Sequence, residues 1–111
     1  MPRLDFYVKY KLYVSIRLRT DVVTVGRDPQ CDLILNSSRV SRQHALIKST
    51  DYGHMIDDLS TNGIRINDSM VESEDHPLNP GDRIYIEDYI LIYQPDDALP
   101  EEFTNMAETR V

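Results

Sequence analysis

Apolar residues recur at every second position along most of the chain, and this spacing constrains the fold more than any other feature. Successive side chains of a β-strand point to opposite faces of a sheet, so a strand with one buried face shows a period of two. Alternating or short apolar runs occupy residues 4–8, 12–18, 23–25, 33–35, 45–47, 54–56, 64–66, 84–86 and 89–93. No stretch before residue 95 shows the spacing of an amphipathic helix. The chain is therefore predicted to be made of strands.

Residues that favour turns separate these runs at intervals of about ten residues. They stand at 28–29, 36–38, 51–53, 61–63, 67–68, 79–82 and 87–88. Many short strands with turns between them are typical of two packed sheets. We therefore predict an all-β fold, an antiparallel β-sandwich, that forms one domain over residues 1–94.

The C-terminal residues differ from the rest in charge. Residues 1–71 contain ten Lys and Arg and eight Asp and Glu, whereas residues 72–111 contain two Arg and eleven Asp and Glu. From Pro95 onward the chain is acidic and has few apolar residues. Such a composition favours disorder. Residues 95–111 are predicted to form an acidic flexible tail or the start of a linker, with a short helix around residues 100–108 as the alternative.

Composition argues against several classes of function. The net charge of −7 makes nucleic acid a poor partner, and no apolar run approaches the roughly 20 residues that cross a bilayer. The N-terminus lacks the apolar core of a signal peptide, so we predict a cytoplasmic protein or part of one. A lone cysteine, Cys31, excludes an internal disulfide, and it is expected to be a small buried residue. The histidines at 44, 54 and 76 are widely spaced, so no metal site and no cofactor are expected.

The stretch from Ser37 to Lys48 carries positive charge where the chain as a whole is negative. It contains two arginines, one lysine and three serines but no carboxylate, and it changes from a polar loop to an apolar strand. Positive charge and hydroxyl donors on a loop braced by a strand are what an anionic group needs. This indicates a phosphate-binding loop.

Other polar clusters stand at strand ends, and each alone has an ordinary structural explanation. Gly26 could occupy a β-bulge beside a solvated Arg27, and the Thr-Asn-Gly sequence at 61–63 is a common tight turn. Ser41 and His44 could suggest a nucleophile and its base, but such a pair also needs an orienting group and an oxyanion site. We therefore expect no enzyme, and expect His44 to brace its loop.

The order of these clusters is more specific than any one of them. Gly26-Arg27, then 41–45 (Ser-Arg-Gln-His-Ala), then 60–63 (Ser-Thr-Asn-Gly) and Asn67 resemble the forkhead-associated (FHA) domain family. Residues 31–33 (Cys-Asp-Leu) also fit that pattern, and the resemblance covers about residues 4–94. It implies a β-sandwich of about eleven strands whose loops at one end bind phosphothreonine peptides.

The resemblance also implies a role for each matching residue. Five residues would form the phosphopeptide site: Arg27, Ser41, Arg42, Thr61 and Asn62. The first two would contact the phosphate, the third the phosphate or the peptide main chain, the fourth the phosphate side of the peptide, and the last the peptide backbone. Four residues would shape the loops without touching the ligand: Gly26, His44, Gly63 and Asn67.

Two points concern the peptide residues that follow the phosphothreonine. Ile64 stands where the family often has threonine, and little effect on binding is expected because a strand begins there. Peptide choice in the family depends largely on a loop contact with the third residue after the phosphothreonine. Residues 68–77 are a candidate for this rim, and their acidic side chains would disfavour an acidic peptide residue nearby.

The resemblance predicts a non-catalytic, phosphothreonine-dependent binding module in Ser/Thr kinase signalling. Its partner would be a phosphothreonine protein, such as a Ser/Thr kinase or a kinase substrate, and neither nucleic acid nor a membrane. The alternative is a phosphate-independent adaptor or oligomerisation domain that uses the aromatic-rich segment 6–13. A further hypothesis is that Thr104 or Thr109, once phosphorylated, brings the tail back onto the same site.

Overall fold

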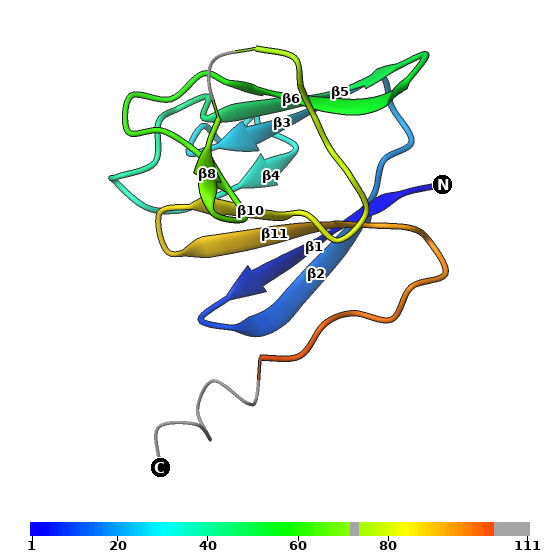
Figure 1. The fold of residues 1–111 in the computed structure, drawn as a ribbon. Helices are drawn as coiled ribbons and strands as arrows, with labels where there is room; N and C mark the ends of the chain where they lie inside the picture. Colours follow the sequence, from blue (N-terminus) through cyan, green and yellow to red (C-terminus); the bar gives the residue numbers. More distant parts are fainter. Residues whose placement is uncertain (72–73, 104–111) are drawn as a thin grey trace.

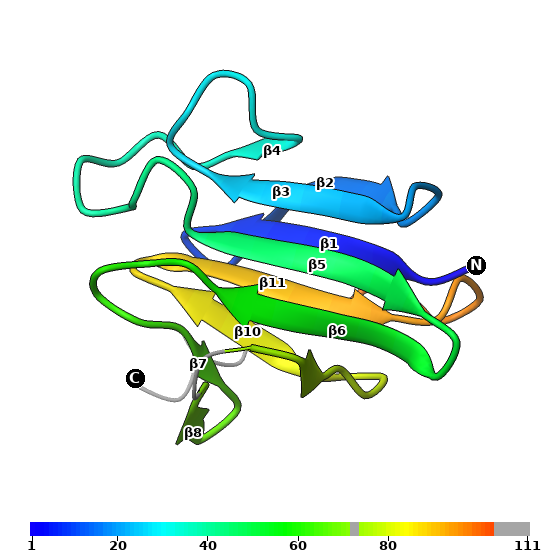
Figure 2. The same ribbon diagram turned by 90° about the horizontal axis from the view of Figure 1, so that it is seen from above.

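Two β-sheets pack face to face in the computed structural model of the protein (Figures 1 and 2). The model describes residues 1–71 and 74–103. All regular elements in these residues are strands, and eleven are present. The prediction of an all-β sandwich is confirmed. Within the described residues, no helix is long and apolar enough to cross a membrane.

The first sheet has the strand order β2-β1-β11-β10-β7-β8. Its strands are β1 (Arg3–Val8), β2 (Lys11–Arg17), β7 (Arg65–Ile66), β8 (Ser69–Met70), β10 (Arg83–Ile86) and β11 (Tyr89–Gln94). The N-terminal strand pairs with the C-terminal one, since Leu4 lies opposite Tyr93 and Phe6 opposite Leu91. This pairing closes the chain into one unit.

The second sheet has the order β4-β3-β5-β6-β9. Its strands are β3 (Val22–Gly26), β4 (Leu33–Ile34), β5 (Ala45–Thr50), β6 (Gly53–Asp58) and β9 (His76–Pro77). All of its pairs are antiparallel except β3 and β4, which run in parallel over two residue pairs. This short contact is the one departure from the predicted antiparallel pairing among the described strands.

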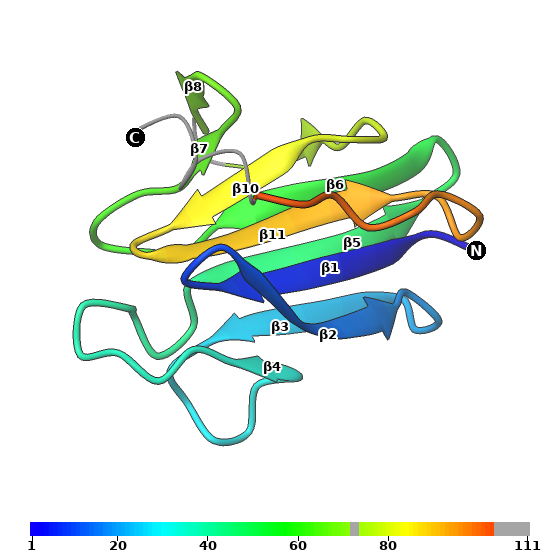
Figure 3. The ribbon, with the colours of Figure 1, turned by 90° about the horizontal axis from the view of Figure 1, so that it is seen from below.

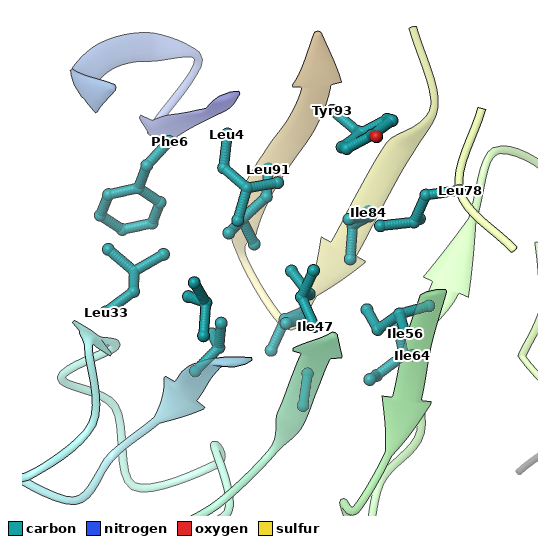
Figure 4. Close-up of a cluster of buried hydrophobic side chains, with 14 of the residues drawn as sticks. Leu4, Phe6, Leu33, Ile47, Ile56, Ile64, Leu78, Ile84, Leu91 and Tyr93 are labelled. Atoms are coloured by element: carbon teal, nitrogen blue, oxygen red, sulfur yellow. The ribbon is translucent and has the colours of Figure 1, made fainter. Parts of the chain in front are cut away.

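Alternate residues of both sheets meet in one hydrophobic core (Figure 4). Leu4, Ile56, Ile84 and Leu91 are fully buried, and Ile47 is almost so. Burying each such side chain contributes about 1.5–3 kcal/mol relative to leaving it exposed. The period of two in the sequence thus gives the inner face of strands such as β5 and β10 directly.

Strands β1 and β11 are buried on their outer faces as well. Tyr7 and Ile92 point away from the main core and form a second cluster with Phe103. The Tyr7 and Phe103 rings meet edge to face at 5.0 Å, and the Tyr7 hydroxyl donates to the carbonyl of Glu101 at 2.7 Å. Residues Pro95–Phe103, here called the C-terminal segment, therefore cover this part of the first sheet (Figure 3).

Arg3 holds the start of the C-terminal segment. Its guanidinium donates to the carbonyls of Pro95 at 2.8 Å, Asp96 at 3.0 Å and Ala98 at 2.6 Å. The same group pairs with the buried carboxylate of Asp5 at 2.7 Å. Irregular chain is tolerated here because its carbonyls have a partner.

The described part of the predicted tail is thus packed rather than free, which corrects the expectation for residues 95–103. Low apolar content misled the prediction, because a few specific contacts anchor the segment: the buried Phe103 ring, the bonds from Arg3 to three carbonyls, and the contacts of Tyr7 and Arg83 with Glu101. Residues 100–103 are not helical. Residues 104–111, with Thr104 and Thr109, lie outside the described residues. The domain boundary at residue 94 stays a prediction.

The long loops gather at one end of the sandwich (Figure 2). The connections β3–β4, β4–β5, β6–β7 and β10–β11 all lie there, together with the β1–β2 turn. The β2–β3 and β5–β6 turns lie at the opposite end. We call the first group the loop end, and it contains almost all of the predicted site residues.

Candidate functional site

The end of β3 lies directly against the β4–β5 loop. The Arg27 amide donates to the Ser41 carbonyl at 3.0 Å, and the Asp28 amide donates to the Arg42 carbonyl at 3.1 Å. A Cβ atom at Gly26 would lie 2.2 Å from that same Arg42 oxygen. Glycine is therefore required by the close approach of two backbones rather than by a bulge.

The Arg27 side chain is exposed but fixed at its base. Its Nε donates to the carbonyl of Val40 at 3.0 Å. Within the described residues, its two terminal nitrogens have no hydrogen-bond partner. The side chain of Arg42, whose carbonyl accepts from the Asp28 amide, is also exposed. The free end of the Arg27 guanidinium can therefore meet an anion at this point.

Ser41 connects the β4–β5 loop with the β6–β7 loop. Its hydroxyl oxygen accepts a hydrogen bond from the Thr61 amide at 3.1 Å. A hydroxyl that already accepts one bond keeps its own proton to donate. Ser41 is half-buried, whereas Thr61 is exposed beside it. The hydroxyl of Ser41 is therefore a positioned donor at the surface.

His44 is fully buried and fixes three segments at once. Its Nδ1 accepts from the Ser41 amide at 3.0 Å, so Nε2 carries the proton and donates to the Gly63 carbonyl at 3.1 Å. Its own amide donates to Val25, and its carbonyl accepts from Leu59. Both ring nitrogens are occupied by main-chain groups, so His44 does not activate the Ser41 hydroxyl.

The β6–β7 loop is held by a short chain of hydrogen bonds. Asp58 accepts from the amide and the hydroxyl of Ser60, at 2.8 and 2.6 Å, and the Ser60 hydroxyl accepts from Gly63 at 2.7 Å. Gly63 has a φ of 96°, which favours glycine. Asn62 is exposed beside it and donates through Nδ2 to the Arg39 carbonyl at 2.9 Å. Its amide oxygen remains available to a ligand.

Asn67 lies apart from this cluster. It forms the β7–β8 turn with a φ of 54°, and its side chain bonds to Asp82 and to the Arg83 amide, each at 3.0 Å. It thus fixes the turn to the start of β10. The structure brings four of the predicted binding residues into one hydrogen-bonded group, and Arg42 next to them, but places Asn67 elsewhere.

A hollow beside Asn62 is a feature that the sequence did not predict. It has a volume of about 270 Å³ and is lined by Asn62, Gly63, Arg65, Met70, Tyr85 and Glu87. The Arg65 guanidinium stacks on the Tyr85 ring at 4.1 Å. No spacing in the sequence indicates that these strands end at one place, because the contact depends on sheet order.

Residues 68–77, the predicted rim, contribute to this hollow only through Met70 among the described residues. Asp75 instead lies 2.5 Å from Lys48, and its amide donates to Asp57 at 2.7 Å. Both carboxylates raise the pKa of Lys48, that of Asp75 more strongly. Asp75 therefore contacts β5 and β6 of the second sheet and not the loop end.

Glu87, which also lines the hollow, approaches a residue of another loop. Arg39 Nε approaches Glu87 Oε1 at 2.9 Å, yet that oxygen receives no well-aligned hydrogen bond in the described chain. The two groups therefore form an ion pair without a well-aligned hydrogen bond. It links the β4–β5 loop to the β10–β11 turn.

Within residues 1–71 and 74–103, the loop end contains neither a candidate metal site nor a reactive thiol. Among the described residues, no group of three or more His, Cys, Asp or Glu side chains could hold a metal ion. Cys31 is buried, and its Sγ donates to the Arg42 carbonyl at 3.3 Å. Burial raises the pKa of the Cys31 thiol, so the thiol stays protonated and takes a structural role.

The chain resembles known proteins over most of its length. The family model of the FHA domain matches residues 23–87. The transcriptional regulatory protein EmbR of Mycobacterium tuberculosis and of Mycobacterium bovis is 36% identical over 78 residues, which is 69% of this chain and 20% of EmbR. The chain therefore spans about a fifth of the curated relatives that it matches.

Solved structures give the same result. EmbR of M. tuberculosis in complex with a low-affinity phosphopeptide is 29% identical with a TM-score of 0.77, over 90% of this chain and 26% of that one. The FhaA FHA domain, complexed with the intracellular domain of Rv3910, is 26% identical with a TM-score of 0.74, over 85% of this chain and 100% of that one. The model match covers more than half of the chain, and the fold agrees with it. The chain belongs to the FHA domain family, a family of non-catalytic binding modules.

Proposed function

We propose that this protein binds phosphothreonine peptides at the loop end. The observation that carries the proposal is the convergence of Arg27, Ser41 and Asn62, which come from three connections and are held together by hydrogen bonds. Each of these side chains keeps a donor or acceptor free for a ligand. The surrounding bonds fix their backbones before any ligand arrives, and such preorganisation lowers the entropy cost of binding.

The phosphate is the ligand group that these donors match best. It carries about −1.5 to −2 charges at neutral pH and three strong acceptor oxygens. The free fork of Arg27 offers two parallel N–H groups, and Ser41 adds a directed hydroxyl. Hydrogen bonds to a charged group contribute about 1.5–3 kcal/mol each. Arg42 is exposed and follows Ser41 in the chain, so it adds positive charge to this loop, and we expect it to contact the phosphate or the peptide main chain.

Asn62 and Thr61 supply recognition of the peptide next to the phosphate. With its Nδ2 bonded to Arg39, Asn62 presents its amide oxygen to a peptide N–H in one orientation. The exposed Thr61 stands between this amide and the Ser41 hydroxyl. Three or four such bonds, less the costs of association and desolvation, correspond to micromolar affinity, about −8 kcal/mol.

The role of the chain is binding without catalysis. Ser41 is the obvious nucleophile at the site, and the base nearest to it in sequence, His44, is fully engaged with backbone groups. We expect the partner to be a phosphothreonine protein such as a Ser/Thr kinase or one of its substrates. A cytoplasmic location and the absence of nucleic-acid or membrane binding stay predictions.

Matched peptides test the proposal. The same sequence is titrated with threonine, phosphothreonine and phosphoserine at one position, and binding is measured by calorimetry. A phosphothreonine library, screened first, supplies the sequence and its preferred flanking residues. We expect micromolar binding of the phosphothreonine form and at least hundredfold weaker binding of the threonine form, since the phosphate bonds are lost. Equal affinity for all three peptides would refute the proposal.

One observation favours a second function alongside the first. The segment 6–13, on which the adaptor alternative rests, contains buried residues such as Tyr7 but also Tyr10, Leu12 and Tyr13, which are exposed. Exposed apolar residues in one strand indicate an interface when they form a continuous patch. The β1–β2 turn of this segment lies at the loop end, and β2 runs from there along the edge of the first sheet.

A further inference from the structure

Strand β2 forms a free edge of the first sheet. It pairs with β1 on one side, and no described strand pairs with its other side (Figure 1). Its burial pattern is exposed or half-buried from Lys11 to Arg17. An edge strand presents a row of unpaired N–H and C=O groups that another extended segment can use.

The exposed edge is apolar at its centre. Leu12, Tyr13 and Val14 are 44%, 75% and 38% exposed. Natural edge strands are usually protected from pairing by charges, prolines or bulges near their middle. Here the pairing with β1 is irregular at Phe6 and Tyr7, which leaves Tyr13 as an extra residue. The centre of the edge nevertheless carries no charge.

Positive charges flank this apolar centre. Lys9, Lys11, Arg17 and Arg19 lie before and after it, and residues 9–20 contain no carboxylate. Arg17 approaches Asp96 at 3.4 Å, whereas the other three form no ion pair within the described chain. The edge is thus locally positive although the chain as a whole has a net charge of −7. Charge complementarity therefore favours an acidic partner at this edge.

A groove lies where β2 meets the C-terminal segment. It has a volume of about 480 Å³, and its walls include Tyr7, Tyr10, Leu12, Leu99 and Phe103. Leu99 is 86% exposed on its rim. The groove can receive an apolar side chain from a segment that runs along β2. Glu102 also lines the groove and disfavours an acidic side chain at that position.

A second copy of this chain is a poor occupant. Antiparallel pairing of β2 with itself, centred on Val14, would place Lys11 of each copy opposite Arg17 of the other. Like charges directly opposite each other destabilise a strand pair. The same geometry places acidic residues of a partner strand opposite both cations, which is attractive.

We propose that the β2 edge is a second docking surface, which pairs with an extended acidic and apolar segment of a partner protein and seats one apolar side chain in the groove. The backbone of the segment extends the first sheet, its carboxylates face Lys9, Lys11 and Arg19, and its apolar residues cover the centre of β2. This surface does not depend on the phosphopeptide site.

An unphosphorylated peptide tests this surface. The probe is a capped peptide that alternates glutamate with leucine and has the length of β2, 7 residues. It is titrated into the full ¹⁵N-labelled chain, and amide shifts and amide exchange are followed. We expect shifts and slowed exchange in residues 11–17 and shifts at the groove, with the loops around Arg27 and Asn62 unchanged. A peptide that alternates lysine with leucine should bind at least tenfold more weakly.

A charge reversal and its matched control locate the contact. Lys11→Glu should weaken binding of the glutamate–leucine peptide about five- to tenfold, because attraction at an exposed site becomes repulsion. Tyr52→Glu adds a negative charge at a residue that is 93% exposed in the β5–β6 turn, and should leave the affinity unchanged. Both residues are exposed, so neither change disturbs the core.

Four results would overturn the proposal. They are the absence of shifts up to about 1 mM peptide, equal binding of the lysine–leucine peptide, shifts confined to the Arg27 and Asn62 loops, and self-association of the wild-type chain through β2 in sedimentation. The last would identify a second copy as the occupant. Because the probe carries no phosphate, none of these results affects the phosphopeptide proposal.

Discussion

The loop end and the C-terminal segment use the same device for opposite purposes. At each place a buried polar side chain holds irregular backbone against the sandwich: His44 holds the β4–β5 and β6–β7 loops, and Arg3 holds Pro95–Ala98. At the C-terminal segment each nitrogen of the Arg3 guanidinium donates to an acceptor within the molecule. At the loop end His44 bonds only to main-chain groups, and exposed side chains such as Arg27 keep donors that no group of the described chain uses.

This difference separates stability from binding. Residues that are satisfied within the molecule contribute to the free energy of unfolding, whereas Arg27, whose fork is free, contributes to binding. His44 should contribute to both, because it is buried and also positions exposed neighbours. The following predictions test this division.

The largest effect is expected at Arg3. Replacing it by methionine leaves the Asp5 carboxylate, which is fully buried, without a cation and with only the Ser15 hydroxyl as a side-chain donor. Breaking a buried pair in this way costs about 3–5 kcal/mol of unfolding free energy. The hydrogen bond to Asp5 is the main cause of the raised pKa of Arg3, which burial alone would lower. Urea unfolding measures the loss, and phosphopeptide affinity should not change.

The double variant Arg3→Met, Asp5→Leu is the matched control. Removing both charges avoids the uncompensated carboxylate, so it should be more stable than the single variant. A single variant as stable as the wild type would show that the Arg3 contacts with Asp5 and with the C-terminal segment add nothing measurable to stability.

His44→Ala should affect both properties. It leaves the Ser41 amide and the Gly63 carbonyl without partners and opens a cavity, at a cost of about 2–4 kcal/mol. Peptide affinity should also fall, since both loops lose their fixed position. The measurements are urea unfolding and calorimetry on the same sample at a temperature where the variant is folded. Undiminished affinity would mean that the loops are positioned without this ring.

Arg27→Ala should affect binding alone. The phosphopeptide affinity should fall about a hundredfold, while the unfolding free energy stays within about 0.5 kcal/mol because the side chain is exposed. Arg27→Lys keeps the charge but not the fork, so it should recover only part of the affinity. If lysine restored full affinity, the contact would be a point charge and not a paired one.

The smallest effect concerns pH and His54, which lies at the far end from the phosphate cluster. Burial lowers the pKa of His54, whose Nδ1 is 2.8 Å from the Tyr93 hydroxyl and whose Nε2 is buried without a partner in the described chain. The unfolded chain, with an ordinary histidine pKa of about 6.5, then binds protons that the folded chain does not. The contribution of neutral His54 to the unfolding free energy should be fully present above about pH 6.5 and be lost as the pH falls towards the lower pKa of the folded state.

The test is urea unfolding at several pH values for the wild type and His54→Asn. The unfolding free energy of the variant should depend less steeply on pH, by an amount that corresponds to a fraction of one proton. Phosphopeptide binding should keep its own pH dependence in both, because the phosphate loses its second charge near a pKa of about 6. Identical stability slopes would assign the pH dependence to other groups.

Sequence pattern and tertiary structure contributed unequally at different places. The inner faces of β1 and β5 could be predicted because a buried face imposes its period on the sequence, whereas β11 is buried on both faces and reads as a continuous apolar run. The role of Gly26 was only half predictable: the glycine was visible, but the backbone that approaches it belongs to Arg42. The packed state of Phe103 was missed, because a single aromatic residue in an acidic stretch gives no period.

The sequence by itself determined which residues face the core and which polar residues stand at strand ends, because both follow from local backbone geometry. Only the tertiary structure decided which strand ends meet. The contacts of Ser41 with Thr61, of His44 with Gly63 and of Arg39 with Glu87 join segments far apart in the chain. They exist because sheet order and the stacking of two sheets bring those loops to one end, and no local pattern encodes that order.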